Sequence, residues 1–274
     1  MKTFKEKLHK DLYQEIKIKK RLINKKSNFQ KIEIFDTVTY GRVLALDGVI
    51  QITEKDEYSY SEMLVHPAMQ ALPKTAKRIL IIGGGDGAVA EEVLKYNHTK
   101  SIDLVDIDKK VVDLSKKYFT KINKNSLINK KVNLFYEDAF NFIDNNQNLY
   151  DLVIADRPDP IGAGKSLFRS NFYKKINNII SDNSIAIFQS GVPFLQKKEL
   201  NQVIKNIKKY FKYYGVYFTV VPSYIGGFMA LAWASNSFDL FKKRNFSMNK
   251  KIYTKYFNKE ILMASFAVPN FLKK

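Results

Sequence analysis

Aspartates at the ends of four successive strand-like segments are the residues of this sequence best suited to chemistry: Asp86, Asp106, Asp138, and Asp156 with Asp159 three residues after it. A single aspartate in such a place is commonly the cap of the next helix. Carboxylates gathered in one crevice are costly, however, unless a cation joins them. The chain has 46 Lys and Arg against 27 Asp and Glu, so a functional role explains this placement of the aspartates better than the overall composition does. We therefore expect a site for a positively charged ligand, in which one carboxylate could also act as a base.

A glycine-rich segment, Gly83-Gly84-Gly85-Asp86-Gly87, joins the apolar run at 79–82 to a helical pattern. Glycines allow a tight turn and the close approach of a ligand, and the next helix directs its free N–H groups into the same space. The next apolar run ends at Asp106 and Asp108, about 20 residues beyond the loop, which is the spacing of a ribose-binding acid. Asp86 would repel a pyrophosphate, so the pattern favours a cationic ligand over a dinucleotide. Taken alone, the same loop would also suit a plain strand-to-helix connection.

The apolar runs alternate with helical patterns from Arg78 onward, which predicts a parallel, doubly wound α/β sheet. The expected strands cover residues 79–82, 102–105, 132–135, 152–155 and 185–188. Ligands bind at the carboxyl ends of such strands, where the aspartates lie. Before this sheet, residues 28–58 alternate in the β manner around the hairpin signal Asp47-Gly48, and residues 62–72 have a helical pattern. We expect a small N-terminal β-meander domain at residues 1–64, a catalytic domain at residues 65–274, and two closing strands within 213–234.

Composition excludes several classes of function. The chain of 274 residues has 45% hydrophobic residues, no cysteine and three histidines, so we expect a globular enzyme without disulfides, thiolate chemistry or a metal site. Its formal net charge of +19 comes from lysines scattered along the whole chain, so we expect neither specific nucleic-acid binding nor a membrane partner. The first twenty residues mix acids and bases and contain no apolar stretch of signal-peptide length, which favours a cytoplasmic location.

Six segments form a pattern that is specific when taken together: 46–51, 56–63, 83–87, 156–168, 222–227 and 267–269. Through them the chain resembles the polyamine aminopropyltransferases, especially bacterial spermidine synthases, from about residue 30 to residue 269. The resemblance implies a Rossmann-like doubly wound sheet of the S-adenosylmethionine-dependent transferase type with a small N-terminal antiparallel β domain. It also implies transfer of an aminopropyl group from decarboxylated S-adenosylmethionine, a co-substrate, to putrescine. The products would be spermidine and 5′-methylthioadenosine, with no cofactor, and the enzyme would be a homodimer or homotetramer.

The resemblance further implies roles for individual residues. Asp156 would be the base that takes a proton from the acceptor amine. The donor would be held by Gln30, Asp86, Asp106, Asp138, the Ala139 backbone, Gly83 and Gly85. The acceptor would contact Tyr60, Ser61, Asp159, Tyr224 and Gln189. For the tyrosines, plain core packing is an equally simple explanation. Residues 161–167 would form a lid that excludes water.

The chain departs from the family pattern at several positions. Asp106 stands where the family usually has Glu, Ser61 replaces His or Gln, Ala139 replaces Gly and Ala163 replaces Pro. Arg157 lies between two acids and could neutralise them or point outward. These changes leave open aminopropyl transfer to another di- or polyamine. Methyl transfer to a small amine and a non-catalytic basic binding protein are the remaining alternatives.

Overall fold

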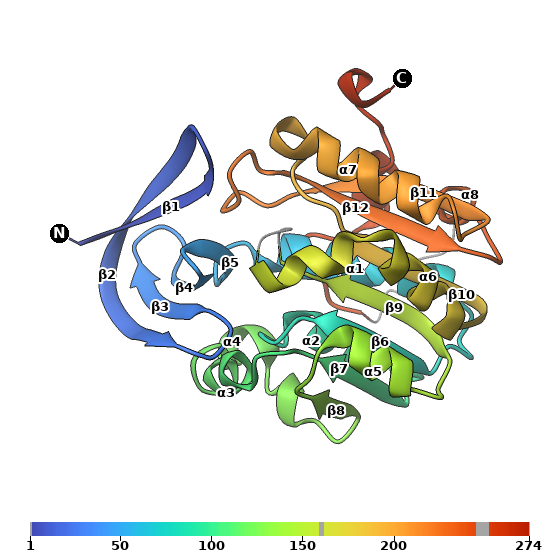
Figure 1. Cartoon of the computed structure of the whole chain (residues 1–274), viewed down its shortest axis with the longest axis horizontal. Helices are drawn as coiled ribbons and strands as arrows, with labels where there is room; N and C mark the ends of the chain where they lie inside the picture. Colours follow the sequence, from blue (N-terminus) through green and yellow to red (C-terminus); the bar gives the residue numbers. More distant parts are fainter. Residues whose placement is uncertain (1, 159–161, 245–251, 274) are drawn as a thin grey trace.

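Two β-sheets of different architecture organise the molecule in the computed structural model, which describes residues 2–158, 162–244 and 252–273 (Figure 1). The N-terminal sheet is antiparallel, and its strands follow chain order: β1 (Thr3–His9), β2 (Leu12–Lys26), β3 (Lys31–Thr37), β4 (Arg42–Leu46) and β5 (Val49–Thr53). The predicted hairpin turn joins β4 to β5, with Asp47 at φ 49° and Gly48 at φ 81°, the left-handed conformation that such a turn requires. The expected N-terminal antiparallel region is therefore confirmed.

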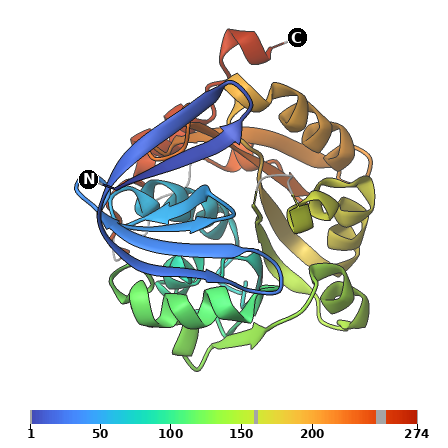
Figure 2. The same cartoon turned by 60° about the vertical axis from the view of Figure 1, so that its left-hand side comes forward.

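Two strands of this sheet, β1 and β2, precede residue 28, where the sequence predicts the first alternation. Only Ile16 and Ile18 of β2 are buried, and the second half of the strand is lysine-rich and largely exposed. A strand with so few apolar positions gives almost no period-two signal, which explains why the sequence did not predict it. Figure 2 shows that β2 is long and bent, and β1 pairs with its first half while β3 pairs with its second half.

The second sheet has the strand order β11-β12-β10-β9-β6-β7-β8. Its strands are β6 (Arg78–Gly83), β7 (Ser101–Val105), β8 (Val132–Phe135), β9 (Tyr150–Asp156), β10 (Ile180–Gln189), β11 (Tyr213–Val220) and β12 (Phe228–Ser235). Strands β6 to β10 pair in parallel and the last two pair antiparallel, so the doubly wound sheet and its closing strands are confirmed. From β6 the chain continues to β7 and β8 on one side of the sheet, and from β9 it continues to β10 on the other side. In such a sheet the ligand crevice lies at the carboxyl ends of β6 and β9.

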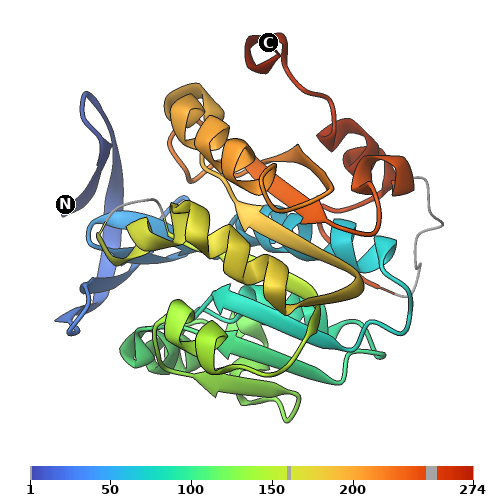
Figure 3. The same cartoon turned by 45° about the vertical axis from the view of Figure 1, so that its right-hand side comes forward.

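Helices cover both faces of the second sheet, and Figure 3 shows α6 and α7 (yellow and orange) over one of them. The helices are α1 (Glu57–Ala71), α2 (Ala88–Leu94), α3 (Lys109–Tyr118), α4 (Thr120–Asn123), α5 (Ala139–Asn145), α6 (Ser170–Ile179), α7 (Pro193–Ile207), α8 (Leu240–Lys243) and α9 (Lys259–Ser265), with 3-10 turns η1 (Ser126–Ile128), η2 (Gly162–Phe168) and η3 (Asn270–Leu272). Alternate residues of β6 face opposite cores, because successive strand side chains point to opposite faces. Ile79 and Ile81 pack in the core that includes α1 and α2, whereas Leu80 and Ile82 pack in the core that includes α5, α6 and α7.

Helix α1 begins at Glu57, five residues before the predicted start at residue 62, and the predicted domain boundary after residue 64 falls inside it. Its first turn is polar, yet Ser59 and Ser61 are buried there. Thr219 of β11 donates a hydrogen bond to the Ser59 carbonyl oxygen at 2.7 Å, which fixes this turn against the second sheet. A polar turn held by tertiary contacts carries no apolar helical period, so the sequence pattern detects only the later part of the helix. In the described part of the chain, no helix is both long enough and apolar enough to cross a membrane.

Candidate active site

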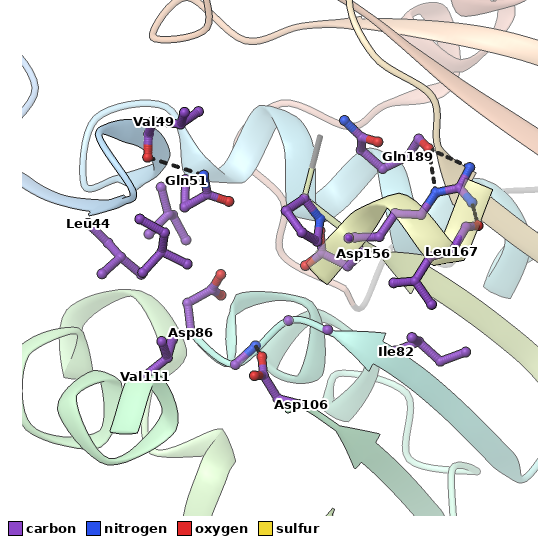
Figure 4. A pocket seen from close by; sticks show the side chains of 18 of the residues that line it. Leu44, Val49, Gln51, Ile82, Asp86, Asp106, Val111, Asp156, Leu167 and Gln189 are labelled. Carbon is purple, nitrogen blue, oxygen red and sulfur yellow. Dashed lines mark hydrogen bonds between the residues drawn. The ribbon is translucent and has the colours of Figure 1, made fainter. Parts of the chain in front are cut away.

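A cavity of about 410 Å³ is lined by the N-terminal sheet and by the carboxyl ends of the strands of the second sheet (Figure 4). Its walls come from β1, β4, β5, α1, the glycine loop after β6, and the ends of β7, β9 and β10. The predicted site residues that line it are Gln30, Tyr60, Ser61, Gly83, Gly85, Asp86, Asp106, Asp138, Ala139, Asp156, Gln189 and Tyr224. Asp159 lies outside the described residues. The fold thus brings the predicted set together, while the role of each residue stays a prediction.

The glycine loop allows the backbone of Asp156 and the carboxylate of Asp106 to approach it closely. Gly83 has φ 82°, and a Cβ there would lie 2.0 Å from the backbone oxygen of Asp156. A Cβ on Gly85 would lie 2.4 Å from Oδ2 of Asp106. Both distances are far inside van der Waals contact, so any side chain at these positions would displace the ends of β7 or β9. The loop therefore needs glycine because the end of β9 lies against Gly83 and the Asp106 carboxylate lies against Gly85.

Asp106 and Asp108 make different contacts in the structure. Oδ2 of Asp106 accepts a hydrogen bond from the Gly85 N–H at 3.1 Å, and Oδ1 accepts from the Asp108 N–H at 2.8 Å. Asp108 caps α3, and its Oδ2 accepts from the Ser27 hydroxyl at 2.6 Å and the Gln30 amide at 3.0 Å. Only Asp106 of the two lines the cavity, so it is the candidate for the ribose. Burial, the largest cause, raises the pKa of Asp106 to about 6.

Asp156 ends β9, and its carboxylate accepts a hydrogen bond from the Tyr60 hydroxyl at 2.7 Å. The pKa of Asp156 is raised to about 7, mainly by burial and next by the charge of Asp86, whereas the bond from Tyr60 opposes the shift. Burial also raises the pKa of Asp86, against the bond that its Oδ1 accepts from the Ala88 N–H at 2.8 Å. Figure 4 shows Asp86, Asp106 and Asp156 around the same space. An arrangement of crowded acids with raised pKa values suits a cation and supplies a base near neutral pH.

Asp138 acts as a helix cap in the structure. Its Oδ1 accepts from the N–H groups of Phe140 at 2.8 Å and Asn141 at 3.4 Å, at the start of α5. The simple capping explanation therefore accounts for its side chain. Asp138 and Ala139 both line the cavity all the same, so the first turn of α5 forms part of its wall.

The predicted acceptor residues differ in the contacts that their side chains make. Tyr60 and Tyr224 meet edge to face with ring centroids 6.0 Å apart, and the Tyr224 hydroxyl donates to the Gln51 carbonyl oxygen at 2.6 Å. They form an aromatic wall suited to an aliphatic ammonium ion. Gln189 lines the cavity, and its buried Oε1 finds no hydrogen-bond partner among the described residues. Ser61 differs, because its hydroxyl turns back within α1 to the Glu57 carboxylate at 3.0 Å.

Arg157 neither faces solvent nor pairs with the neighbouring acids in the contacts that the structure describes. It is 2% exposed, and its guanidinium lies 3.8 Å from the centre of the Phe168 ring. It donates to the carbonyl oxygens of Leu167 and Gln189 and to the Tyr173 hydroxyl. Arg157 therefore ties the end of β9 to the end of η2 and the end of β10. Of the predicted lid, residue 161 lies outside the described residues, and the rest belongs to η2.

Sequence reasoning missed three glutamates that line the cavity, Glu6, Glu57 and Glu137. Glu6 is 2% exposed and accepts hydrogen bonds from the Ile50 N–H at 2.9 Å and from the Gln14 amide. It lies on β1, a strand with no sequence signal, so nothing in the pattern indicated it. Glu57 lies three and four residues before Tyr60 and Ser61, the spacing of one helical face. That spacing would have indicated Glu57 if the helix had been predicted to begin there.

The doubly wound sheet and the small antiparallel sheet form a Rossmann-like fold of the S-adenosylmethionine-dependent methyltransferase type, with the acidic cavity at its switch point. Residues 57–244 match the family model described as the spermine/spermidine synthase domain, and residues 3–54 match the spermidine synthase tetramerisation domain. The chain belongs to the spermine/spermidine synthase family of polyamine aminopropyltransferases, and it is an enzyme.

Relatives of known name and structure align over nearly the whole chain. A polyamine aminopropyltransferase of Buchnera aphidicola subsp. Acyrthosiphon pisum is 39% identical, over 99% of this chain and 96% of the relative. A polyamine aminopropyltransferase of Clostridioides difficile is 38% identical, over 94% of this chain and 93% of the relative. A crystal structure of spermidine synthase in complex with the transition state analogue AdoDATO superposes with a TM-score of 0.93 at 30% identity, over 99% of this chain and 94% of that one. The crystal structure of spermidine synthase from Thermotoga maritima superposes with a TM-score of 0.90 at 29% identity, over 99% of this chain and 93% of that one.

Proposed function

We propose that this enzyme is a spermidine synthase that transfers the aminopropyl group of decarboxylated S-adenosylmethionine to putrescine. The observation that carries the proposal is the carboxylate of Asp156, with a pKa raised to about 7, held by Tyr60 in a cavity that also contains Asp86 and Asp106. An amine acceptor has a pKa above about 10, so in water it is protonated and has no lone pair to attack with. A carboxylate with a raised pKa that faces the cavity can take that proton.

The proposed step balances as a single displacement. Asp156 takes one proton from the ammonium, and the freed nitrogen lone pair forms a bond to the donor carbon next to the sulfonium. The bond between that carbon and sulfur breaks, and its electrons leave sulfur neutral in 5′-methylthioadenosine. The product nitrogen stays protonated as a secondary ammonium, and Asp156 releases the proton that it took to solvent. In this reaction Tyr60 orients Asp156 through the 2.7 Å hydrogen bond, and positioning of this kind contributes to rate beyond proton transfer.

Donor recognition follows from the other carboxylates. Asp106 would bind the ribose hydroxyls, and Asp86 would face the primary ammonium of the donor's aminopropyl chain. Ordinary S-adenosylmethionine carries a carboxylate next to that ammonium, and Asp86 would repel it. The reaction as proposed uses the donor as a co-substrate and needs no cofactor or metal. The match of residues 3–54 supports assembly into a homotetramer, with a homodimer as the smaller alternative.

Product analysis tests the function directly. The purified protein is incubated with decarboxylated S-adenosylmethionine and, separately, putrescine, cadaverine, agmatine or spermidine, and products are identified by mass spectrometry. Aminopropylated putrescine is the expected product, and Asp156→Asn should abolish turnover while 5′-methylthioadenosine still binds. Transfer to another amine alone would overturn putrescine as the acceptor. The absence of any transfer, or methylation from intact S-adenosylmethionine, would overturn the proposed reaction.

A further inference from the structure

Glu57 presents a carboxylate to the cavity that the proposed reaction does not yet use. It lies in the first turn of α1, and Tyr60 and Ser61 follow on the same face of the helix. Ser61 Oγ lies 3.0 Å from both Oε2 and the carbonyl oxygen of Glu57, to which its hydroxyl can donate, whereas the Tyr60 hydroxyl donates to Asp156 at 2.7 Å. One helical turn therefore carries both the residue that holds the base and an additional acid in the cavity wall.

The surroundings of Glu57 leave its charge poorly compensated. Its pKa is raised to about 7, mainly by burial, with smaller contributions from the negative charges of Glu92 and Asp86, while the Ser61 hydrogen bond and the Lys255 charge oppose the shift. An acid in the first turn of a helix usually gains from the helix dipole at the surface and needs no burial. Glu57 instead lines the same cavity as Asp86, and the charge of Asp86 disfavours the ionised form of Glu57. A cation placed between two such carboxylates would relieve the repulsion.

We propose that Glu57 is a second carboxylate of the donor's aminopropyl subsite and that Glu57 and Asp86 together bind the donor's primary ammonium. This inference rests on the proposed function. Ser61 supports it because its short side chain directs its hydroxyl to Glu57 and so orients the carboxylate. Two negative groups at this subsite discriminate against the carboxylate of intact S-adenosylmethionine more strongly than one. Glu57 is thus a residue for donor selection, distinct from Asp156, which acts on the acceptor.

Calorimetric binding to Glu57→Gln tests the inference, because glutamine keeps an oxygen for the Ser61 hydroxyl and removes only the charge. We expect the dissociation constant of decarboxylated S-adenosylmethionine to rise roughly 10- to 100-fold, as for loss of a hydrogen bond to a charged group. The affinity for 5′-methylthioadenosine, which has no ammonium, should stay within about two-fold. Glu57→Asp should retain more donor affinity than Glu57→Gln. Glu54→Gln, the same change outside the cavity, should leave both affinities unchanged.

The outcomes separate the two proposals. Equal donor affinity in the wild type and Glu57→Gln would overturn the role of Glu57 and leave the proposed function standing. Equal weakening of donor and 5′-methylthioadenosine would also overturn it, because that result indicates a structural effect. Weaker binding of putrescine alone would place Glu57 on the acceptor side and overturn the assignment. A wild-type protein that binds 5′-methylthioadenosine but not the decarboxylated donor would overturn the proposed function, and the inference with it.

Discussion

At the scale of single residues, the ionisation of Asp156 makes a prediction about pH. Its pKa is raised to about 7, first by burial and then by the charge of Asp86, and the Tyr60 hydroxyl opposes the shift. Because kcat/KM reports ionisations of the free enzyme, we expect it to rise with pH through about 7. Tyr60→Phe removes the opposing hydrogen bond, so the pKa of Asp156 should increase and the profile should move to higher pH. Steady-state rates between about pH 5.5 and about pH 8.5 measure both effects.

Tyr224→Phe provides the matched control. The Tyr224 hydroxyl donates to the carbonyl oxygen of Gln51, so its loss should change substrate affinity without the same displacement of the pH profile. A profile that moves to lower pH in Tyr60→Phe, or one that moves equally in both variants, would contradict the assignment of Asp156 as the base.

The sequence could predict the cavity aspartates because strand periodicity and strand ends are local features. Asp86, Asp106 and Asp156 follow buried strands, and a parallel sheet brings such ends together whatever the loops do. The direction of Arg157 could not be predicted, because it depends on Phe168 and on carbonyl groups from other elements. Glu57 was missed for a related reason, since its place on a helical face depends on where tertiary contacts start the helix.

At the scale of elements, the glycine loop positions the carboxylate of Asp106. In Gly85→Ala the new Cβ would lie 2.4 Å from Oδ2 of Asp106, so the carboxylate must move. We expect 5′-methylthioadenosine to bind at least about ten-fold more weakly, because the proposed contact of Asp106 with the ribose would be lost. Gly48→Ala is the control, since its Cβ meets nothing within 4 Å and its φ of 81° affects only the hairpin. That variant should lose about 1 kcal/mol of stability and keep its affinity. Unchanged affinity in Gly85→Ala, measured by calorimetry, would argue against Asp106 as the ribose ligand.

A second prediction at this scale concerns the link that Arg157 makes between β9, η2 and β10. Arg157→Lys keeps the charge but cannot donate to the carbonyl oxygens of Leu167 and Gln189 in the same forked geometry. We expect kcat to fall about ten-fold or more and η2 to become more sensitive to protease. Tyr173→Phe removes only one partner of the guanidinium and should have a smaller effect. Protease sensitivity equal to that of the wild type would contradict a role for Arg157 in holding η2.

At the scale of the whole molecule, the cavity carboxyls make the stability of the folded protein depend on pH. The pKa values of Asp156 and Glu57 are raised to about 7 and that of Asp106 to about 6, mainly by burial. The folded state therefore holds protons that the unfolded chain releases above about pH 4, and stability from these groups is lost as pH rises through 6 to 7. His66 acts in the opposite sense below about pH 6.5, because burial lowers its pKa to about 3. We expect the Tm of the ligand-free protein to fall between about pH 6.5 and about pH 7.5, and to fall less in Asp156→Asn. A Tm that rises over this interval in scanning calorimetry would contradict the raised pKa values.

Assembly is the last property that the whole molecule predicts. The N-terminal sheet matches a tetramerisation domain, and its exposed apolar side chains include Leu12, Tyr13 and Val38. A small sheet with exposed apolar residues gains stability by pairing with another copy. We expect light scattering to give about 127 kDa, four chains of 31.8 kDa, at working concentrations.

The double variant Leu12→Glu with Tyr13→Glu should reduce this mass, because burying two charges at an interface is unfavourable. Leu149→Glu, the same change at an exposed leucine next to β9, should leave the mass unchanged. A mass of one chain in the wild type would show that the N-terminal sheet is stable alone, and an unchanged mass in the double variant would place the interface elsewhere.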